Sequence, residues 1–186
     1  MWHDINIVEE INDGNLFLRK ISKEDTNFFY ESLKDKNITD YLSLGPLRSL
    51  DHSKSLIKNY LKYWDKYIQF NYIIELREGS KPLKIGSVSL WSLSWQHKRA
   101  EVGVWLTPNY WKKGIGKNTL EMIKKIAFYH LKLNRLQAHI ALKNTRSINT
   151  FRNSGFREEG ILREYLNLNG NFHDAIILAC LKEVRQ

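Results

Sequence analysis

The spacing of hydrophobic and polar positions predicts strands and helices in a mixed order. Residues 16–21 alternate as a strand does, and Ser22 with Asp25 three positions later is typical of a helix start, which predicts a helix through residue 34. A second helix is predicted from residue 51, with apolar side chains at helical spacing: Ile57, Tyr60, Leu61 and Trp64. Residues 72–77 and 84–91 then read as a hairpin around Glu78, Gly79 and Ser80.

The second half of the chain continues in the same manner. A strand is predicted over residues 100–106, and a helix over 119–131 whose apolar stripe is Leu120, Ile123, Ile126 and Ala127. A strand over 136–142, a helix beginning near 144 and two final strands complete the pattern. No linker, repeat or low-complexity block interrupts it. We therefore expect residues 1–186 to form a single mixed α/β domain.

A glycine-rich and basic segment lies between the strand at 100–106 and the helix that follows it. Gly114 and Gly116 allow a tight turn, and the next helix adds the positive end of its dipole, so the segment is a candidate phosphate cradle. It is neither a Walker loop nor a dinucleotide fingerprint, because Trp111 and Thr119 stand where those motifs need glycine. Its residues are Trp111, Lys112, Lys113, Gly114, Ile115, Gly116, Lys117 and Asn118.

Further motifs follow in a recognisable series. Residues 100–106 precede the cradle, and it is followed by Asn144-Thr145-Arg146-Ser147, Gly155-Phe156, residues 159–163 and residues 169–174. In order and spacing this series resembles the GNAT superfamily of acyl-CoA-dependent N-acetyltransferases, and within it the Rim-type ribosomal-protein N-acetyltransferases. The resemblance spans residues 16–181. It implies a central, mostly antiparallel and splayed sheet of six to seven strands, flanked by about four helices.

The same resemblance implies acetyl-CoA as cofactor, CoA as product, and no metal. In the family the sheet splays between the strand that carries Glu101 and the strand at 136–142, and the pantetheine arm lies in the opening. The backbone of Val104, Trp105 and Leu106 would then bind the pantetheine and the thioester oxygen. The cradle from Trp111 to Asn118 would bind the pyrophosphate, and Asn144 and Ser147 would contact the cofactor from the facing side.

Two residues are candidates for proton transfer. Glu101 shares its strand face with Gly103 and Trp105, and its family counterpart accepts the amine proton through water; the alternative is a salt bridge with Arg99 or another base. The position where many GNAT enzymes carry a tyrosine holds Phe151, so Ser147 is the candidate donor to the leaving sulfur, as in the Rim-type pattern. The alternative for Ser147 is capping of the helix.

Aromatic side chains are expected to form the acceptor pocket, whose candidates are Tyr41, Trp91, Trp95 and Tyr165. The Rim-type resemblance makes a protein N-terminal amine the expected acceptor. A small-molecule amine (a polyamine, an aminoglycoside or a toxic aminoacyl compound) is the alternative within the enzyme class, and a non-catalytic acyl-CoA-binding module is the alternative outside it. An acidic cleft would favour a polyamine, and a broad open cleft would favour a protein terminus.

Composition adds few constraints. The formal charge of +9 suits an anionic cofactor, and the lysines are spread along the chain with no nucleic-acid motif, so we expect no direct nucleic-acid binding. The six histidines lack metal-ligand spacing. One cysteine, Cys180, in an apolar strand, and no long apolar run indicate a cytoplasmic protein without a membrane segment. A homodimer is compatible with these features.

Overall fold

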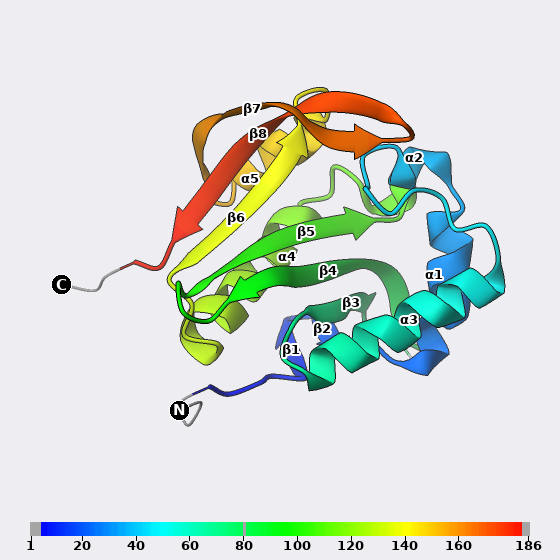
Figure 1. The fold of residues 1–186 in the computed structure, drawn as a ribbon. Coiled ribbons are helices and arrows are strands. Elements are labelled where there is room, and N and C mark those ends of the chain that lie inside the picture. Colours follow the sequence, from blue (N-terminus) through cyan, green and yellow to red (C-terminus); the bar gives the residue numbers. More distant parts are fainter. Residues whose placement is uncertain (1–4, 80, 184–186) are drawn as a thin grey trace.

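A computed structural model describes residues 5–79 and 81–183 of the 186-residue chain (Figure 1). Its centre is an eight-stranded sheet with the order β1-β2-β3-β4-β5-β6-β8-β7, antiparallel except for the β5–β6 pair. The strands are β1 (Glu10–Asp13), β2 (Leu16–Lys20), β3 (Phe70–Leu76), β4 (Leu83–Ser94), β5 (Arg99–Leu106), β6 (Arg135–Ala141), β7 (Arg157–Leu168) and β8 (Asn171–Leu181).

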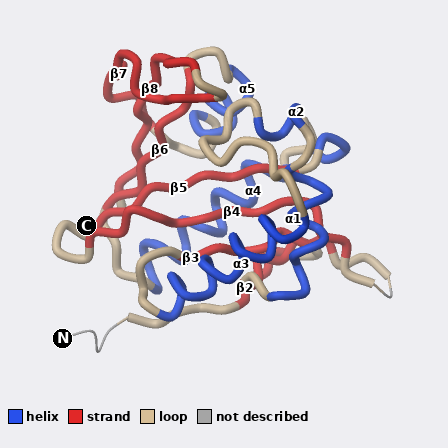
Figure 2. Tube along the Cα trace, turned by 45° about the vertical axis from the view of Figure 1, so that its right-hand side comes forward, coloured by secondary structure: helices blue, strands red, loops and turns tan. Residues whose placement is uncertain are grey.

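Helices cover both faces of this sheet (Figures 1 and 2). They are α1 (Thr26–Leu33), α2 (Lys36–Thr39), α3 (Leu50–Asp65), α4 (Ile115–Lys125) and α5 (Thr145–Arg152). A π-helical turn, Ile126–His130, continues α4. None of the helices in the described part of the chain is long and apolar enough to cross a membrane.

The predicted mixed α/β fold is confirmed, with one more strand than expected. The additional strand, β1, pairs antiparallel with β2 through only four residue pairs and is mostly exposed, so its sequence carries little apolar alternation. The single-turn helix α2 was likewise not predicted. Its start depends on the Asp35 side chain, which accepts a hydrogen bond from the Asn37 backbone N–H at 2.8 Å.

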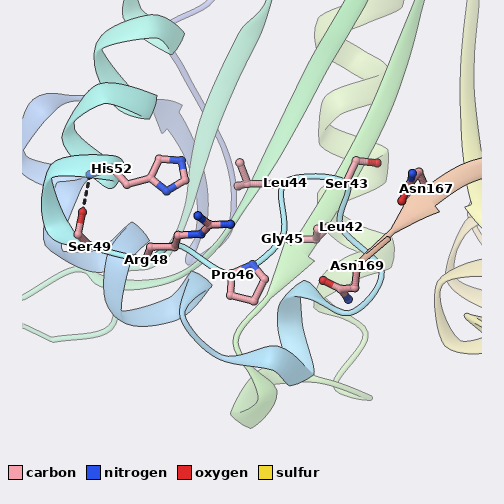
Figure 3. A pocket seen from close by; sticks show the side chains of 10 residues that line it. All are labelled: Leu42, Ser43, Leu44, Gly45, Pro46, Arg48, Ser49, His52, Asn167 and Asn169. Carbon is pink, nitrogen blue, oxygen red and sulfur yellow. Dashed lines mark hydrogen bonds between the residues drawn. The ribbon is translucent and has the colours of Figure 1, made fainter. Parts of the chain in front are cut away.

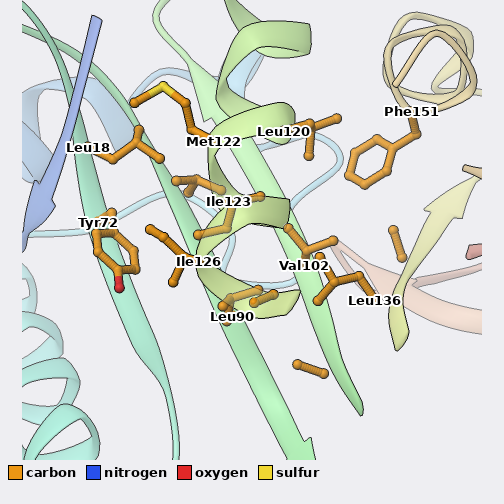
Figure 4. Packing of buried hydrophobic residues seen from close by; sticks show 14 of the residues in the cluster. Leu18, Tyr72, Leu90, Val102, Leu120, Met122, Ile123, Ile126, Leu136 and Phe151 are labelled. Atoms are coloured by element: carbon orange, nitrogen blue, oxygen red, sulfur yellow. The ribbon is translucent and has the colours of Figure 1, made fainter. Parts of the chain in front are cut away.

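The two faces of the sheet have separate apolar cores. On one face the predicted stripe of Leu120, Ile123 and Ile126 packs against Leu90 and Val102 (Figure 4). On the other face, side chains of α1 and α3 such as Phe29 and Ile57 pack with Ile21 and Ile73. Alternate residues of β5 therefore divide between the faces: Val102 belongs to the α4 side, and Trp105 to the side of α1 and α3.

The pairing of β5 with β6 is short. It comprises Arg99 with Arg135, Ala100 with Leu136 and Glu101 with Gln137, after which the two strands diverge (Figure 1). Beyond Glu101, the next residues of β5 continue to pair with β4 on their other side. The sheet thus opens into a V whose vertex lies at Glu101, as the family resemblance implies.

Candidate functional site

A cavity of about 530 Å³ lies where β5 and β6 diverge. The end of β5, the segment after it and the start of α5 supply most of its lining, and the α2 region supplies the rest. Of the predicted cofactor residues, the cavity brings together Val104, Trp105, Leu106, Trp111, Lys112, Lys113, Gly114, Gly116, Lys117, Asn144 and Ser147. Ile115 and Asn118 belong to the same helical turn but are not lining residues.

The cradle begins with two residues in the left-handed region. Lys112 has a φ of 59°, and Gly114, which is the N-cap of α4, has a φ of 78°. The first N–H groups of a helix have no intrahelical acceptor, and this N-terminus lies at the wall of the cavity among three lysines. The segment is held to β5 because the Trp111 indole N–H donates to the Leu106 carbonyl at 2.7 Å. The arrangement suits a bound phosphate.

Gly116 has a different role from the one that its spacing suggested. It lies inside α4 and does not have a positive φ, so the turn does not require it. A Cβ at this position would lie 3.1 Å from the Thr150 Cγ2 of α5 and 4.0 Å from a Leu106 methyl carbon. Gly116 therefore permits the close approach of α4 to α5, which shapes one end of the cavity.

Arg146 is a cavity residue that the sequence reasoning did not single out. Its guanidinium lies 3.5 Å from the centroid of the Trp111 ring, so it joins α5 to the cradle across the opening of the V. Desolvation lowers the pKa of this guanidinium, but an arginine stays charged at neutral pH. The signal was present in the sequence, since Arg146 belongs to the segment Asn144-Thr145-Arg146-Ser147 that carries the family resemblance.

The cap of α5 is Asn144 rather than Ser147. The Asn144 Oδ1 accepts a hydrogen bond from the Ser147 backbone N–H at 3.2 Å. Within residues 5–79 and 81–183 the Ser147 hydroxyl has no hydrogen-bond partner, and it lies at the cavity wall. Phe151, at the position of the family's tyrosine, is buried against Phe156 with ring centroids 4.9 Å apart. Ser147 thus lines the cavity with a hydroxyl available for hydrogen bonding, in a wall that Thr145 and Thr150 also form.

A second cavity, of about 760 Å³, adjoins the first, since Leu42 lines both (Figure 3). It lies between the loop that leads from α2 into α3 and the tip of the β7–β8 hairpin. Its lining residues are Leu42, Ser43, Leu44, Gly45, Pro46, Arg48, Ser49, His52, Asn167 and Asn169. None of the described residues that line either cavity is Asp or Glu.

Glu101 lies at the vertex of the V, on the face of β5 that also carries Trp105. It is not a lining residue of either cavity, and at about 3.3 Å per residue its Cα is on the order of 10 Å from that of Val104. Its carboxylate Oε2 is 3.1 Å from the His139 Nδ1, and within the described residues it forms no salt bridge with Arg99.

The four predicted acceptor aromatics do not lie together. Trp91 and Tyr165 lie near the vertex of the V, Tyr41 lines the first cavity, and Trp95 lies elsewhere. Trp91 pairs with Glu101 in the sheet, and its ring covers Gly103 so closely that a Cβ there would lie 2.7 Å from it. Tyr165 packs on His139 with ring centroids 4.6 Å apart. Tyr41 lines the first cavity, and its hydroxyl donates to the Lys143 carbonyl at 3.5 Å.

Trp95 lies away from both the vertex of the V and the first cavity. Its indole N–H donates to the Tyr67 carbonyl at 3.1 Å, and its ring meets the edge of Phe70. The chain turns back after β4, at the end of the strand, which carries Trp95 toward the end of α3. Trp64, which continues the apolar spacing of the predicted second helix, is buried in the core. No group of three or more His, Cys, Asp or Glu that could hold a metal ion occurs in the part of the chain that the structure describes.

Comparisons with known proteins agree with this geometry. The acetyltransferase (GNAT) domain model matches residues 15–157. An uncharacterized N-acetyltransferase of Bacillus subtilis, YoaA, is 27% identical over 172 residues, which cover 92% of this chain and 96% of that protein.

Solved structures of this kind include two bound to a form of CoA. The spermidine N-acetyltransferase of Vibrio cholerae in complex with CoA and spermine superposes with a TM-score of 0.80 at 25% identity, covering 91% of this chain and 96% of that one. Mycobacterium smegmatis RimJ in complex with CoA-disulfide superposes with a TM-score of 0.82 at 20% identity, covering 89% and 81%, which supports the fold. With the splayed sheet and the glycine cradle at its opening, this chain belongs to the GNAT acetyltransferase family and is an N-acetyltransferase.

Proposed function

We propose that this enzyme transfers an acetyl group from acetyl-CoA directly to the α-amine of a protein N-terminus. The donor occupies the 530 Å³ cavity and the amine approaches from the adjoining 760 Å³ cavity. The absence of carboxylates among the described lining residues of both cavities is the observation that carries this choice of acceptor.

Residues around the first cavity match the chemistry of CoA. The start of α4, with Lys112, Lys113 and Lys117 beside it, offers amide N–H groups and positive charge to the pyrophosphate. Trp105 and Leu106, beyond the vertex, offer backbone groups to the pantetheine arm. A Cβ at Gly114 would meet no atom within 4 Å, so the space in front of the cradle is open for a ligand.

Acetyl-CoA supplies a thioester: the amine nitrogen forms a bond to the carbonyl carbon, the carbon–sulfur bond breaks, and CoA leaves as thiolate. An α-amine has a free pKa near ~7.8, so a modest base suffices to take its proton. Glu101 accepts that proton through water, since Glu101 does not line either cavity and is therefore too far from the amine for direct contact. The Ser147 hydroxyl, uncommitted in the cap of α5, donates to the departing sulfur.

A polyamine carries several ammonium groups, and acidic side chains along its binding site would complement their charge. The second cavity offers Arg48 and His52 together with serine and asparagine side chains. Such a lining offers no carboxylate to a polycation and can hydrogen-bond the carbonyl and N–H groups of a peptide backbone. The similarity to the Vibrio cholerae spermidine N-acetyltransferase favours a polyamine as the second candidate acceptor.

A panel of acceptors tests the proposal. The purified chain is incubated with acetyl-CoA and either short unblocked peptides of varied first residue or spermidine, and CoA release and product mass are recorded. We expect acetylation of peptide α-amines, loss of the signal with N-terminally blocked peptides, and little transfer to spermidine. Faster transfer to spermidine than to any peptide would refute the choice of acceptor. Binding of acetyl-CoA without transfer to any amine would indicate a non-catalytic acyl-CoA-binding module.

A further inference from the structure

Three side chains from three different strands meet at the vertex of the V. Glu101 comes from β5, His139 from β6 and Tyr165 from β7. The His139 Nδ1 lies 3.1 Å from the Glu101 Oε2, and the Tyr165 ring lies against the imidazole at 4.6 Å and an interplanar angle of 39°. The His139 side chain is 8% exposed and the Glu101 side chain 18%, so the contact is shielded from solvent.

The position of this contact in the sheet is informative. Backbone pairing between β5 and β6 stops at Glu101 and Gln137, and His139 is the next residue of β6 on the same face. His139 therefore bridges the two strands where the main chains have begun to separate. Without it, no other side chain in the described part of the chain hydrogen-bonds the carboxylate, which would be free to rotate in the opening.

The chemistry of the pair assigns the donor. An ionised carboxylate only accepts hydrogen bonds, so the Nδ1 of His139 carries a hydrogen and donates a hydrogen bond to Oε2. The second oxygen, Oε1, has no hydrogen-bond partner within residues 5–79 and 81–183. One carboxylate oxygen is thus held by the protein, and the other is left for a water molecule.

Tyr165 reaches His139 because β7 is irregular. The register of β7 against β8 shifts between Leu162 and Leu166, and Glu164 within this bulge has a φ of 50°. The Glu164 backbone N–H donates to the Asp174 Oδ1 at 2.9 Å, which holds the bulge. Bulges re-aim side chains next to active sites, and this one turns the Tyr165 ring onto the imidazole.

We propose that His139 is a positioning residue: it fixes the Glu101 carboxylate so that its free oxygen faces the water that carries the amine proton, and Tyr165 keeps the imidazole in place. The inference rests on the proposed function of Glu101 as the base. In the transfer step the amine proton moves by way of that water to Oε1, while Oε2 keeps the hydrogen bond from Nδ1. His139 itself neither gains nor loses a proton.

Two substitutions separate positioning from packing. His139→Leu removes the donor, and His139→Asn retains a side-chain N–H at nearly the same distance along the side chain. With the peptide acetylated fastest in the panel above, we expect His139→Leu to lower kcat about 10- to 100-fold with little change in the KM for acetyl-CoA, and His139→Asn to recover a large part of the loss. If His139 had a purely structural role, the loss of kcat would follow a loss of folding stability, and His139→Asn would not recover kcat.

A double mutant tests whether His139 acts through Glu101. We expect the double mutant Glu101→Gln/His139→Leu to have the same kcat as Glu101→Gln alone. The reason is that His139 contributes only through the Glu101 carboxylate, which the first change already removes. Gln137→Leu, on the same strand face, serves as the control and should keep the wild-type kcat. Multiplicative losses in the double mutant would overturn the inference. If Glu101→Gln keeps the wild-type kcat, the base assignment fails, whereas a Glu101-dependent kcat that His139→Leu leaves intact overturns only this inference.

A second test does not depend on catalysis, so it applies even if no acceptor amine is acetylated in the panel. Nitrogen-15 NMR of the imidazoles, with His139→Asn to assign the signal, reports which ring nitrogen carries the proton. We expect the Nδ1–H tautomer in the wild type and its loss in Glu101→Leu. The Nε2–H tautomer in the wild type would overturn the inference, independently of acetyl transfer.

Discussion

Asp25 anchors the start of α1 to the sheet, and its substitution by asparagine should destabilise the protein in a pH-dependent manner. The side chain is fully buried and receives hydrogen bonds from both terminal nitrogens of Arg19, at 2.8 and 2.7 Å, and from the Ser22 backbone N–H at 2.8 Å. The Lys84 Nζ lies 2.6 Å from the same carboxylate. This cluster joins β2, β4 and the turn before α1, the helix that covers the face of the sheet that carries Trp105.

The magnitude follows from the ionisation of Asp25. Burial acts to raise its pKa, but hydrogen bonds from Arg19, Lys84 and Ser22 outweigh burial and lower the pKa from 3.8 to about 2. At about 1.36 kcal/mol per pH unit, this difference stabilises the folded state by about 2 kcal/mol at neutral pH. For a domain of this length, Asp25→Asn should lower Tm by roughly 4–8 °C.

The pH dependence has a definite sign. A carboxyl group whose pKa is lowered on folding stabilises the protein above its unfolded pKa, and the stabilisation is lost as the pH falls through the folded pKa. Urea unfolding of the wild type and of Asp25→Asn between pH 7 and pH 2 should therefore show a gap of about 2 kcal/mol that closes between about pH 4 and pH 2. Contributions from other groups cancel in this gap.

The control is Asp51→Asn, because Asp51 pairs with Lys54 at 3.0 Å while its side chain is 87% exposed. Such a surface pair contributes about 0–1 kcal/mol, so we expect a small change in the free energy of unfolding. An Asp25→Asn gap no larger than that of the control at pH 7, or one that persists unchanged to pH 2, would refute the reasoning.

Three further predictions concern the cofactor and acceptor sides. Gly114→Val should weaken acetyl-CoA binding about tenfold by calorimetry, because a β-branched residue is strained at a φ of 78°; Gly79→Val, with the same strain at 76°, should leave binding unchanged. Gly103→Ala should displace the Trp91 ring and raise the KM for the amine while acetyl-CoA affinity stays constant. Arg146→Ala should weaken acetyl-CoA binding by about fivefold, more at low salt than at high salt; equal loss at both would argue against a charge contact.

Much of the framework could be read from local patterns. Ser22 and Asp25 form a capping box on a 3-10 turn, Lys23–Asp25, that leads directly into α1. The stripe that begins at Leu120 packs on the sheet, and Gly114 caps α4 in the left-handed region. These features depend on a few neighbouring residues, whose backbone and side-chain preferences act within one or two turns. The order of the predicted elements followed from them.

Other features were not accessible in this way. Gly116 serves the approach of Thr150 from another helix, and Trp95 turns away to Tyr67 although it lies only four positions after Trp91. In both cases the deciding contact is with a residue many positions away in sequence. Periodicity assigns a face to a side chain, but it does not say which distant element covers that face.

The sequence by itself therefore determined the order of all strands and helices except β1 and α2, the glycine cradle and the strand face of Glu101, because each depends on local spacing. Only the tertiary structure decided what surrounds that carboxylate. The short pairing of β5 with β6 opens the sheet beside it, His139 crosses the opening, and the bulge in β7 carries Tyr165 onto the imidazole. These arrangements depend on where three strands diverge and shift in register, which is set by the packing of the whole sheet.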